Sequence, residues 1–189
     1  MPALHRLGGR PYNAGRNEGK NMIHVCSLAA LPATVETSGA SHILTIMANV
    51  DQVQRPASVL AANHLKVQVD DITEAIEGFV APSEVHVEQV LNFVRGWDRS
   101  APLVVHCYAG ISRSTASAFA AACALNPHRD EFAIARQIRA ASAIAQPNRL
   151  IVSLADKALG REGRMLRALD EMGPGSLTSV GQPFRIDLE

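Results

Sequence analysis

The chain has 189 residues, a length that suits one domain with a sizeable core. Lysine plus arginine equals aspartate plus glutamate at 18 each, so the net charge gives no indication of binding to nucleic acid or to a membrane surface. No apolar run approaches the length of a membrane span and no secretory signal is visible, while the three cysteines include no Cys-x-x-Cys pair, which argues against a disulfide scaffold or a zinc ribbon. We therefore expect a cytoplasmic protein with reduced thiols, without membrane insertion, nucleic-acid partner, cofactor or metal.

The two ends of the chain differ from its middle in composition. Residues 1–21 are rich in Gly, Arg and Asn and lack apolar periodicity, so they are predicted to be a disordered extension or tag. Residues 173–189 are punctuated by Gly and Pro and are predicted to form a loose C-terminal tail. The folded domain is therefore predicted to span residues 22–172.

Apolar patterns divide this domain into strands and helices. In chain order they predict a strand over 23–28, a helix over 32–38, a strand over 41–48, a loop with one helical turn over 51–63, a strand over 64–69, a short helix over 72–80, a long amphipathic helix over 82–97, a strand over 102–107, and helices over 115–125, 130–142, 149–159 and 163–172. Strands that alternate with helices, followed by helices alone, predict an α/β fold with a mostly parallel central sheet flanked by helices and a helical C-terminal part.

One stretch, His-Cys-Tyr-Ala-Gly-Ile-Ser-Arg-Ser at residues 106–114, lies between the last predicted strand and an alanine-rich helix. A loop that joins a strand end to a helix N-terminus directs several backbone N–H groups at one point and forms an anion site. Cys107 at this place is expected to be a thiolate. Arg113 can grip two phosphate oxygens, and Gly110 permits a backbone conformation that a Cβ would resist. The stretch therefore predicts a nucleophile within an anion-binding loop.

These residues resemble the signature of the cysteine-dependent protein tyrosine phosphatase superfamily, which is His-Cys, five residues, and then Arg followed by Ser or Thr. The form Ala-Gly-Ile-Ser-Arg-Ser resembles the dual-specificity branch. The resemblance implies a phosphatase-like fold for residues 22–172 and the hydrolysis of phosphate monoesters through a cysteinyl-phosphate intermediate. The substrate would be a phosphoprotein, with phosphotyrosine and then phosphoserine or phosphothreonine as the candidates, or a small phosphoester.

The resemblance also implies roles for the residues of the loop. Cys107 would be the nucleophile, and Arg113 would stabilise the equatorial oxygens. The loop residues that would bind the phosphate with their backbone amides are Tyr108, Ala109, Gly110, Ile111, Ser112 and Arg113. Ser114 resembles the hydroxyl that assists release of the thiolate in the second step, and its alternative role is to cap the helix. His106 would shape the loop. Adjacent residues at a strand end point to opposite faces, which disfavours a Cys-His protease dyad.

A general acid must come from another segment. Asp70 and Asp71 follow the predicted strand 64–69, where the family keeps its aspartate, and the family spacing favours Asp71; exposed carboxylates at a strand end are the alternative.

Asn148 follows Pro147 and resembles an asparagine that braces the phosphate loop, with an ordinary helix N-cap as an equal alternative.

Other functions stay open at this stage. A non-catalytic phosphate-binding module is the main alternative, although such proteins usually lose the cysteine, the arginine or the acid, and all three are present here. A lipid, nucleotide or sugar phosphate could be the substrate in place of a phosphoprotein. The loop has no lysine, unlike that of inositol-lipid phosphatases that handle several phosphates, which weakens a polyphosphoinositide substrate. A rhodanese-like or arsenate-reductase-like use of the loop fits less of the chain.

Overall fold

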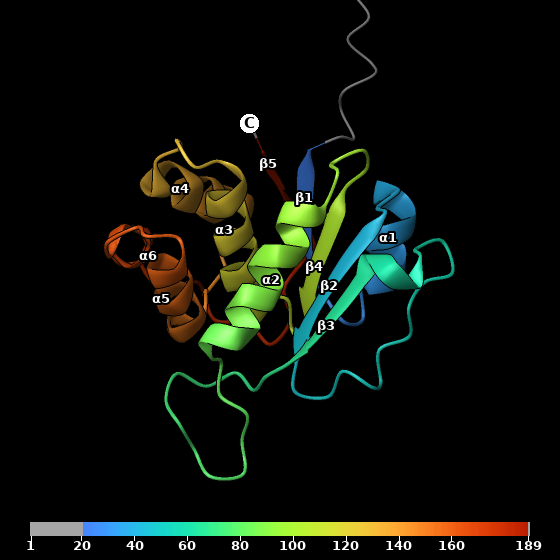
Figure 1. Cartoon of the computed structure of the whole chain (residues 1–189), viewed down its shortest axis with the longest axis horizontal. Helices are drawn as coiled ribbons and strands as arrows, with labels where there is room; N and C mark the ends of the chain where they lie inside the picture. Colours follow the sequence, from blue (N-terminus) through green and yellow to red (C-terminus); the bar gives the residue numbers. More distant parts are fainter. Residues whose placement is uncertain (1–20, 189) are drawn as a thin grey trace, which may run out of the picture.

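The computed structural model describes residues 21–188, and within them the chain forms one five-stranded sheet with helices on both faces (Figure 1). The strand order is β3-β2-β4-β1-β5. The strands are β1 (Met22–Ser27), β2 (His42–Met47), β3 (His64–Gln68), β4 (Leu103–Cys107) and β5 (Phe184–Asp187). The helices are α1 (Leu31–Ser38), α2 (Glu84–Gly96), α3 (Arg113–Leu125), α4 (Glu131–Ala141), α5 (Arg149–Ala158) and α6 (Arg164–Met172), with a 3-10 turn over Ala61–Asn63.

The sheet is parallel except at one edge, as the alternation of strands and helices predicted. β4 lies between β1 and β2, and β2 pairs with β3, all in parallel. Every residue of β4 is buried, which explains its continuous apolar run around His106. β5 pairs antiparallel with β1, with Ile186 beside Ile23. The central strand therefore ends at Cys107, and parallel α/β folds bind ligands at this carboxyl end of their strands.

Two apolar cores lie on the two faces of the sheet. The smaller core joins α1, through Leu31 and Val35, to side chains such as Ile43 of the sheet. The larger core joins the other sheet face to α2–α6, and Phe119 of α3 is fully buried in it. Figure 1 shows α1 on one side of the sheet and α2–α6 on the other. Because α3 is covered on all sides by the larger core, its N-terminus is held firmly beneath the loop that follows β4.

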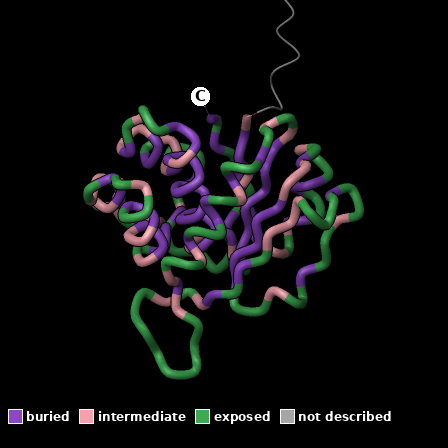
Figure 2. Tube along the Cα trace, viewed as in Figure 1, coloured by how far each residue is buried: buried purple, intermediate pink, exposed green. Residues whose placement is uncertain are grey.

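The segment between β3 and α2 differs from its prediction. No helix forms over 72–80. Asp70 donates its backbone N–H to the Val80 carbonyl at 2.7 Å and accepts the Val80 N–H on its Oδ2 at 2.8 Å, so the chain closes a loop. Gly78 lies at φ +83°, a conformation that interrupts a helix. Figure 2 shows this loop as the long exposed projection at the end of the molecule. The apolar residues that suggested a helix, among them Ile76 and Phe79, are exposed.

The prediction of a loose C-terminal tail is wrong for the residues that form β5. Ile186 is fully buried and Leu188 is nearly so, and the Leu188 N–H donates to the Asn21 carbonyl at 3.0 Å. Phe184 and Ile186 alternate with exposed residues, as in a half-buried edge strand. Asn21, the last residue of the predicted N-terminal extension, is thus tied to β5; residues 1–20 lie outside the described part, and the domain boundaries stay predictions.

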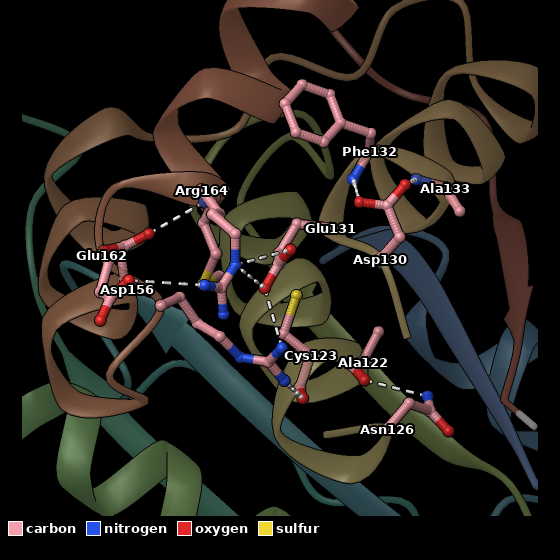
Figure 3. Close-up of polar contacts among 12 residues, drawn as sticks. Ala122, Cys123, Asn126, Asp130, Glu131, Phe132, Ala133, Asp156, Glu162 and Arg164 are labelled. Carbon is pink, nitrogen blue, oxygen red and sulfur yellow. Dashed lines mark hydrogen bonds and ion pairs between the residues drawn. The ribbon is translucent and has the colours of Figure 1, made fainter. Parts of the chain in front are cut away.

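A buried ionic cluster ties α4 to the start of α6. The Glu131 carboxylate, 2 % exposed, accepts hydrogen bonds from Arg161 at 2.8 Å and from Arg164 at 3.2 Å. Asp156 accepts the backbone N–H groups of Gly163 and Met165 and so completes the N-terminus of α6. Figure 3 shows Glu131, Asp156 and Arg164 converging between the helices. Removing one partner would leave a buried charge uncompensated, so the cluster fixes how the C-terminal helices meet.

Among the residues that the structure describes, none of the helices is both long enough and apolar enough to span a membrane.

Candidate active site

Cys107 ends β4, and the loop that follows turns directly into α3 at Arg113. Gly110 makes this turn possible. It lies at φ +75°, and a Cβ on it would stand 2.7 Å from the backbone carbon of Cys26 and from the backbone nitrogen of Ser27. Glycine is therefore required at this position both for its conformation and for the close approach of β1.

The carbonyl groups of this loop face outward, and donors from three separate segments hold them there. The Tyr108 carbonyl accepts the Leu28 N–H at 3.1 Å, and the Ala109 carbonyl accepts the Gly181 N–H at 2.8 Å. The carbonyls of Ile111 and Ser112 accept backbone N–H groups from the connection between α4 and α5: Gln146 at 3.0 Å and Asn148 at 3.3 Å. A trans peptide places its N–H opposite its C=O. The N–H groups of Ala109, Gly110, Ser112 and Arg113 are thereby turned toward the inside of the loop, as an anion site requires.

The Cys107 sulfur lies at the floor of this loop. It accepts a hydrogen bond from the Gly110 N–H at 3.2 Å, and it lies 3.2 Å from the Ser114 hydroxyl. Ser112, not Ser114, occupies the N-cap position of α3, and it makes no side-chain capping bond. The structure therefore does not show Ser114 as the N-cap of α3, which was its alternative role. The Gly110 N–H therefore donates directly to the sulfur, and the Ser114 hydroxyl lies within hydrogen-bond distance of it.

Arg113 lies beside the loop with only part of its guanidinium engaged. Its Nη1 donates to the Val69 carbonyl at 2.9 Å, which ties α3 to the end of β3. Its Nε is buried and has no hydrogen-bond partner among the described residues, although Oδ2 of Asp71 lies 3.9 Å away. A buried donor without an acceptor is costly unless a ligand satisfies it.

The two aspartates after β3 have different surroundings. Asp71 Oδ1 accepts hydrogen bonds from the Ser112 hydroxyl at 2.7 Å and from the Asn148 side chain at 2.9 Å. Its Oδ2 accepts no hydrogen bond among the described residues and faces Arg113. Asp70 instead binds the Val80 N–H and closes the exposed loop. The structure therefore brings Asp71, and not Asp70, to the loop over residues 107–113.

Asn148 serves both of the roles that the sequence left open. Its Oδ1 accepts the N–H groups of Leu150 and Ile151 and caps α5. Its Nδ2 donates to Asp71 Oδ1 and to the Ile72 carbonyl at 3.2 Å, while its backbone N–H holds the Ser112 carbonyl. One buried residue thus joins the aspartate and the start of α5 through its side chain, and the loop through its backbone N–H.

His106 is fully buried and does not contact the Cys107 sulfur. Its Nε2 lies 2.6 Å from the Thr45 hydroxyl, which lies 2.8 Å from Nε2 of His64. Burial lowers the pKa of His106 to about 4, and nearby His64 and Lys66 add to this effect, so the imidazole is neutral at pH 7. Burial likewise lowers the pKa of His64 to about 4. The two histidines and Thr45 thus link β4, β2 and β3 through hydrogen bonds, and His106 does not act as a base.

Solved structures of phosphatases share this arrangement of elements. The Cydia pomonella PTP-2 phosphatase superposes with a TM-score of 0.56 at 17% identity, over 71% of this chain and 84% of its own. DUSP15 gives a TM-score of 0.55 at 20% identity over 82% of this chain and 94% of its own. PTPMT1, in complex with PI(5)P, gives a TM-score of 0.56 at 14% identity over 78% of this chain and 94% of its own. No family model matches the sequence, and no curated protein matches it significantly.

The chain has the dual-specificity phosphatase fold. The resemblance drawn from residues 106–114 is confirmed at this level. In this phosphatase fold the predicted site residues meet around one loop: Cys107, Gly110, Ser112, Arg113, Ser114, Asp71 and Asn148. Tyr108, by contrast, turns its side chain outward and is 64 % exposed, so only its backbone belongs to the loop.

Sequence reasoning missed three contributors to this site, namely Thr45, His64 and Gly181. Thr45 lies on β2, next to β4, and contacts His106, while His64 lies on β3 and contacts Thr45. These contacts depend on the strand order, which periodicity does not specify. Gly181 lies 72 residues beyond Ala109 in a stretch without apolar pattern. A signal for the histidine pair was present, since two polar residues stand within apolar strand patterns, but nothing local marks Gly181.

Proposed function

We propose that this protein is a phosphatase that hydrolyses phosphate monoesters through a cysteinyl-phosphate on Cys107. The observation that carries the proposal is the buried Nε of Arg113, which has no hydrogen-bond partner among the described residues, beside a loop whose Gly110 N–H donates to the cysteine sulfur. These donors stabilise charge on the equatorial oxygens of a phosphoryl group in transfer. The fold shared with phosphatases supports the same conclusion.

In the first step, the Cys107 sulfur attacks phosphorus opposite the leaving oxygen. The S–P bond forms as the P–O ester bond breaks, and the leaving oxygen takes a proton from Asp71. Oδ1 of Asp71 already accepts two hydrogen bonds, so Oδ2 is the oxygen left to exchange a proton with the leaving group. The product is the free alcohol or phenol and a cysteinyl-phosphate.

In the second step, water attacks the phosphorus of the cysteinyl-phosphate. Asp71 accepts a proton from this water, the S–P bond breaks, and the sulfur leaves as a thiolate. The Ser114 hydroxyl, 3.2 Å from the sulfur, donates a hydrogen bond to the departing thiolate. Inorganic phosphate then dissociates and Asp71 is again protonated, which completes the cycle.

The loop suits a substrate with one phosphate. Its residues between Cys107 and Arg113 carry no charge, so the charge available for phosphate binding comes from Arg113 and the backbone. We propose a phosphoprotein substrate, with phosphotyrosine first and phosphoserine or phosphothreonine second. The similar structure of PTPMT1 was solved with PI(5)P, which makes a monophosphorylated lipid the alternative to a phosphoprotein.

A substrate panel with a nucleophile variant tests the proposal. The wild-type chain is expected to hydrolyse an aryl phosphate in the presence of a chelator, and Cys107→Ser is expected to abolish this activity. The kcat/KM is then measured for phosphopeptides, PI(5)P, a nucleotide and a sugar phosphate, and these values rank the substrates. Activity of Cys107→Ser equal to that of the wild type would overturn the mechanism. Phosphate binding without turnover on any member would favour the non-catalytic binding module.

A further inference from the structure

The C-terminal segment, residues 173–188, crosses the active-site end of the sheet before it pairs with β1. Its first part lies on the connection between α4 and α5. The Gly175 N–H donates to the Gln146 side chain at 2.6 Å, and the Ser176 N–H donates to the Ala143 carbonyl at 3.0 Å. Its last part is β5. Between these two anchored parts it reaches the phosphate-binding loop at Gly181.

Gly181 makes a close backbone contact with two residues of that loop. Its N–H donates to the Ala109 carbonyl at 2.8 Å. A Cβ at this position would stand 2.9 Å from the Gly110 carbonyl oxygen and 3.3 Å from that of Ala109. Since backbone atoms cannot yield as a flexible side chain can, only glycine fits between the segment and the loop.

This contact controls the direction of one loop N–H group. The peptide that joins Ala109 to Gly110 is trans, so its C=O and N–H point in opposite directions. Gly181 holds the carbonyl outward, and the Gly110 N–H consequently points at the Cys107 sulfur, 3.2 Å away. Glycine offers little resistance to rotation of a neighbouring peptide. If this peptide rotated, the Ala109 carbonyl would face the bound anion and repel it.

We propose that Gly181 is a positioning residue that keeps the Ala109–Gly110 peptide in the anion-binding orientation, and that the C-terminal segment thereby contributes to the active site at this one residue. The proposal deepens the proposed function and rests on it, because it concerns binding of a phosphoryl group by this loop. Gly181 acts through the loop and does not itself touch the substrate.

Binding of tungstate, a tetrahedral oxyanion, to the full-length chain carrying Cys107→Ser tests the proposal by calorimetry. Gly181→Ala adds the methyl group that meets the Gly110 carbonyl, and Gly181→Pro removes the N–H that holds Ala109. Each is expected to weaken tungstate binding about tenfold or more, in line with the loss of an aligned oxyanion donor. With Cys107 restored, kcat/KM is expected to fall by a similar factor.

Two control variants separate positioning from a loss of stability. Gly96→Ala adds a methyl group at the end of α2 where nothing lies within 4 Å, and it is expected to leave binding unchanged and the melting temperature equal or slightly raised. Ile186→Ala removes a fully buried side chain of β5, and it is expected to lower the melting temperature without changing tungstate affinity below the transition.

The outcomes distinguish this proposal from the proposed function. If the Cys107→Ser chain binds no tungstate, the anion site itself is wrong and both proposals fail. If it binds tungstate and Gly181→Ala binds equally well, the role of Gly181 fails and the proposed function stands. If Gly181→Pro does not fold, the milder Gly181→Ala variant decides.

Discussion

The side-chain nitrogen of Asn148 lies 2.9 Å from Oδ1 of Asp71, and it joins the residue that caps α5 to the carboxylate beside the phosphate-binding loop. The same Oδ1 accepts the Ser112 hydroxyl, so two donors fix the carboxylate through one oxygen. This arrangement leaves Oδ2 directed at Arg113. The position of the proposed acid therefore depends on a residue 77 positions away in the sequence.

Asn148→Ala is expected to reduce both stability and activity. Loss of the cap costs about 1 kcal/mol, and loss of the Nδ2 donor frees Asp71 to rotate, which lowers kcat. Asp130→Ala is the matched control, because Asp130 caps α4 through Phe132 and Ala133 on a helix that does not touch the loop. Both variants are to be compared by urea unfolding and by turnover of an aryl phosphate. Equal activity of the two variants would show that Asn148 acts only as a cap.

Asp71→Asn is expected to slow hydrolysis of an alkyl phosphate by about 10²-fold and hydrolysis of an activated aryl phosphate much less. The reason is that a poor leaving group depends on the proton that the acid donates. Asp70→Asn is expected to affect both substrates little, since Asp70 is engaged with the Val80 N–H. The measurement is kcat for both substrates in both variants. The reverse pattern would move the acid to Asp70, and no selective loss in either variant would place the acid elsewhere, with Asp51 or Glu74 as the next candidates.

Ser114→Ala is expected to slow release of phosphate from Cys107 by about tenfold, because a thiolate leaving group loses a charge-assisted hydrogen bond. Formation of the intermediate is affected less, so a burst of phenol release before steady turnover is the expected signature. Ser117→Ala is the control: Ser117 lies one turn further along α3, is fully buried, and has no hydrogen-bond partner for its hydroxyl among the described residues. A burst in both variants, or in neither, would contradict the role of Ser114.

The parts of the fold that were predictable from sequence are those whose cause is local. β4 and the loop after it follow from a buried apolar run, a glycine and a helix start, and Cys107 and Arg113 follow from their spacing within it. β5 was missed because its four residues hold only Phe184 and Ile186 as apolar positions, and its partner β1 lies about 160 residues earlier. The predicted helix over 72–80 was wrong because its apolar residues, here exposed, have no core to face.

Cys107 is expected to be the first cysteine that mild peroxide oxidises. Burial raises the pKa of Cys26 and of Cys123 to about 12, so both stay as thiols at pH 7, whereas the Cys107 sulfur accepts the Gly110 N–H inside the loop. Peptide mapping after a brief peroxide treatment is expected to find sulfenic acid or its products at Cys107, and bound phosphate is expected to prevent this. Modification of Cys26 or Cys123 before Cys107 would show that the loop does not favour the thiolate.

His106 is expected to make the fold less stable in acid. Burial lowers its pKa from 6.5 to about 4 in the folded chain, so between these two values the unfolded chain binds more protons than the folded one. The free energy of unfolding therefore falls as the pH is lowered through this window, and His64 contributes in the same direction.

His106→Gln keeps a polar group near Thr45 but cannot be protonated there. It is expected to lower stability at pH 7 and to flatten the decline between pH 6.5 and pH 4, measured by urea unfolding at several pH values; the control is His128→Gln, which replaces an exposed histidine. An unchanged slope in His106→Gln, or an equally flattened slope in His128→Gln, would show that the buried imidazole is not the group that titrates.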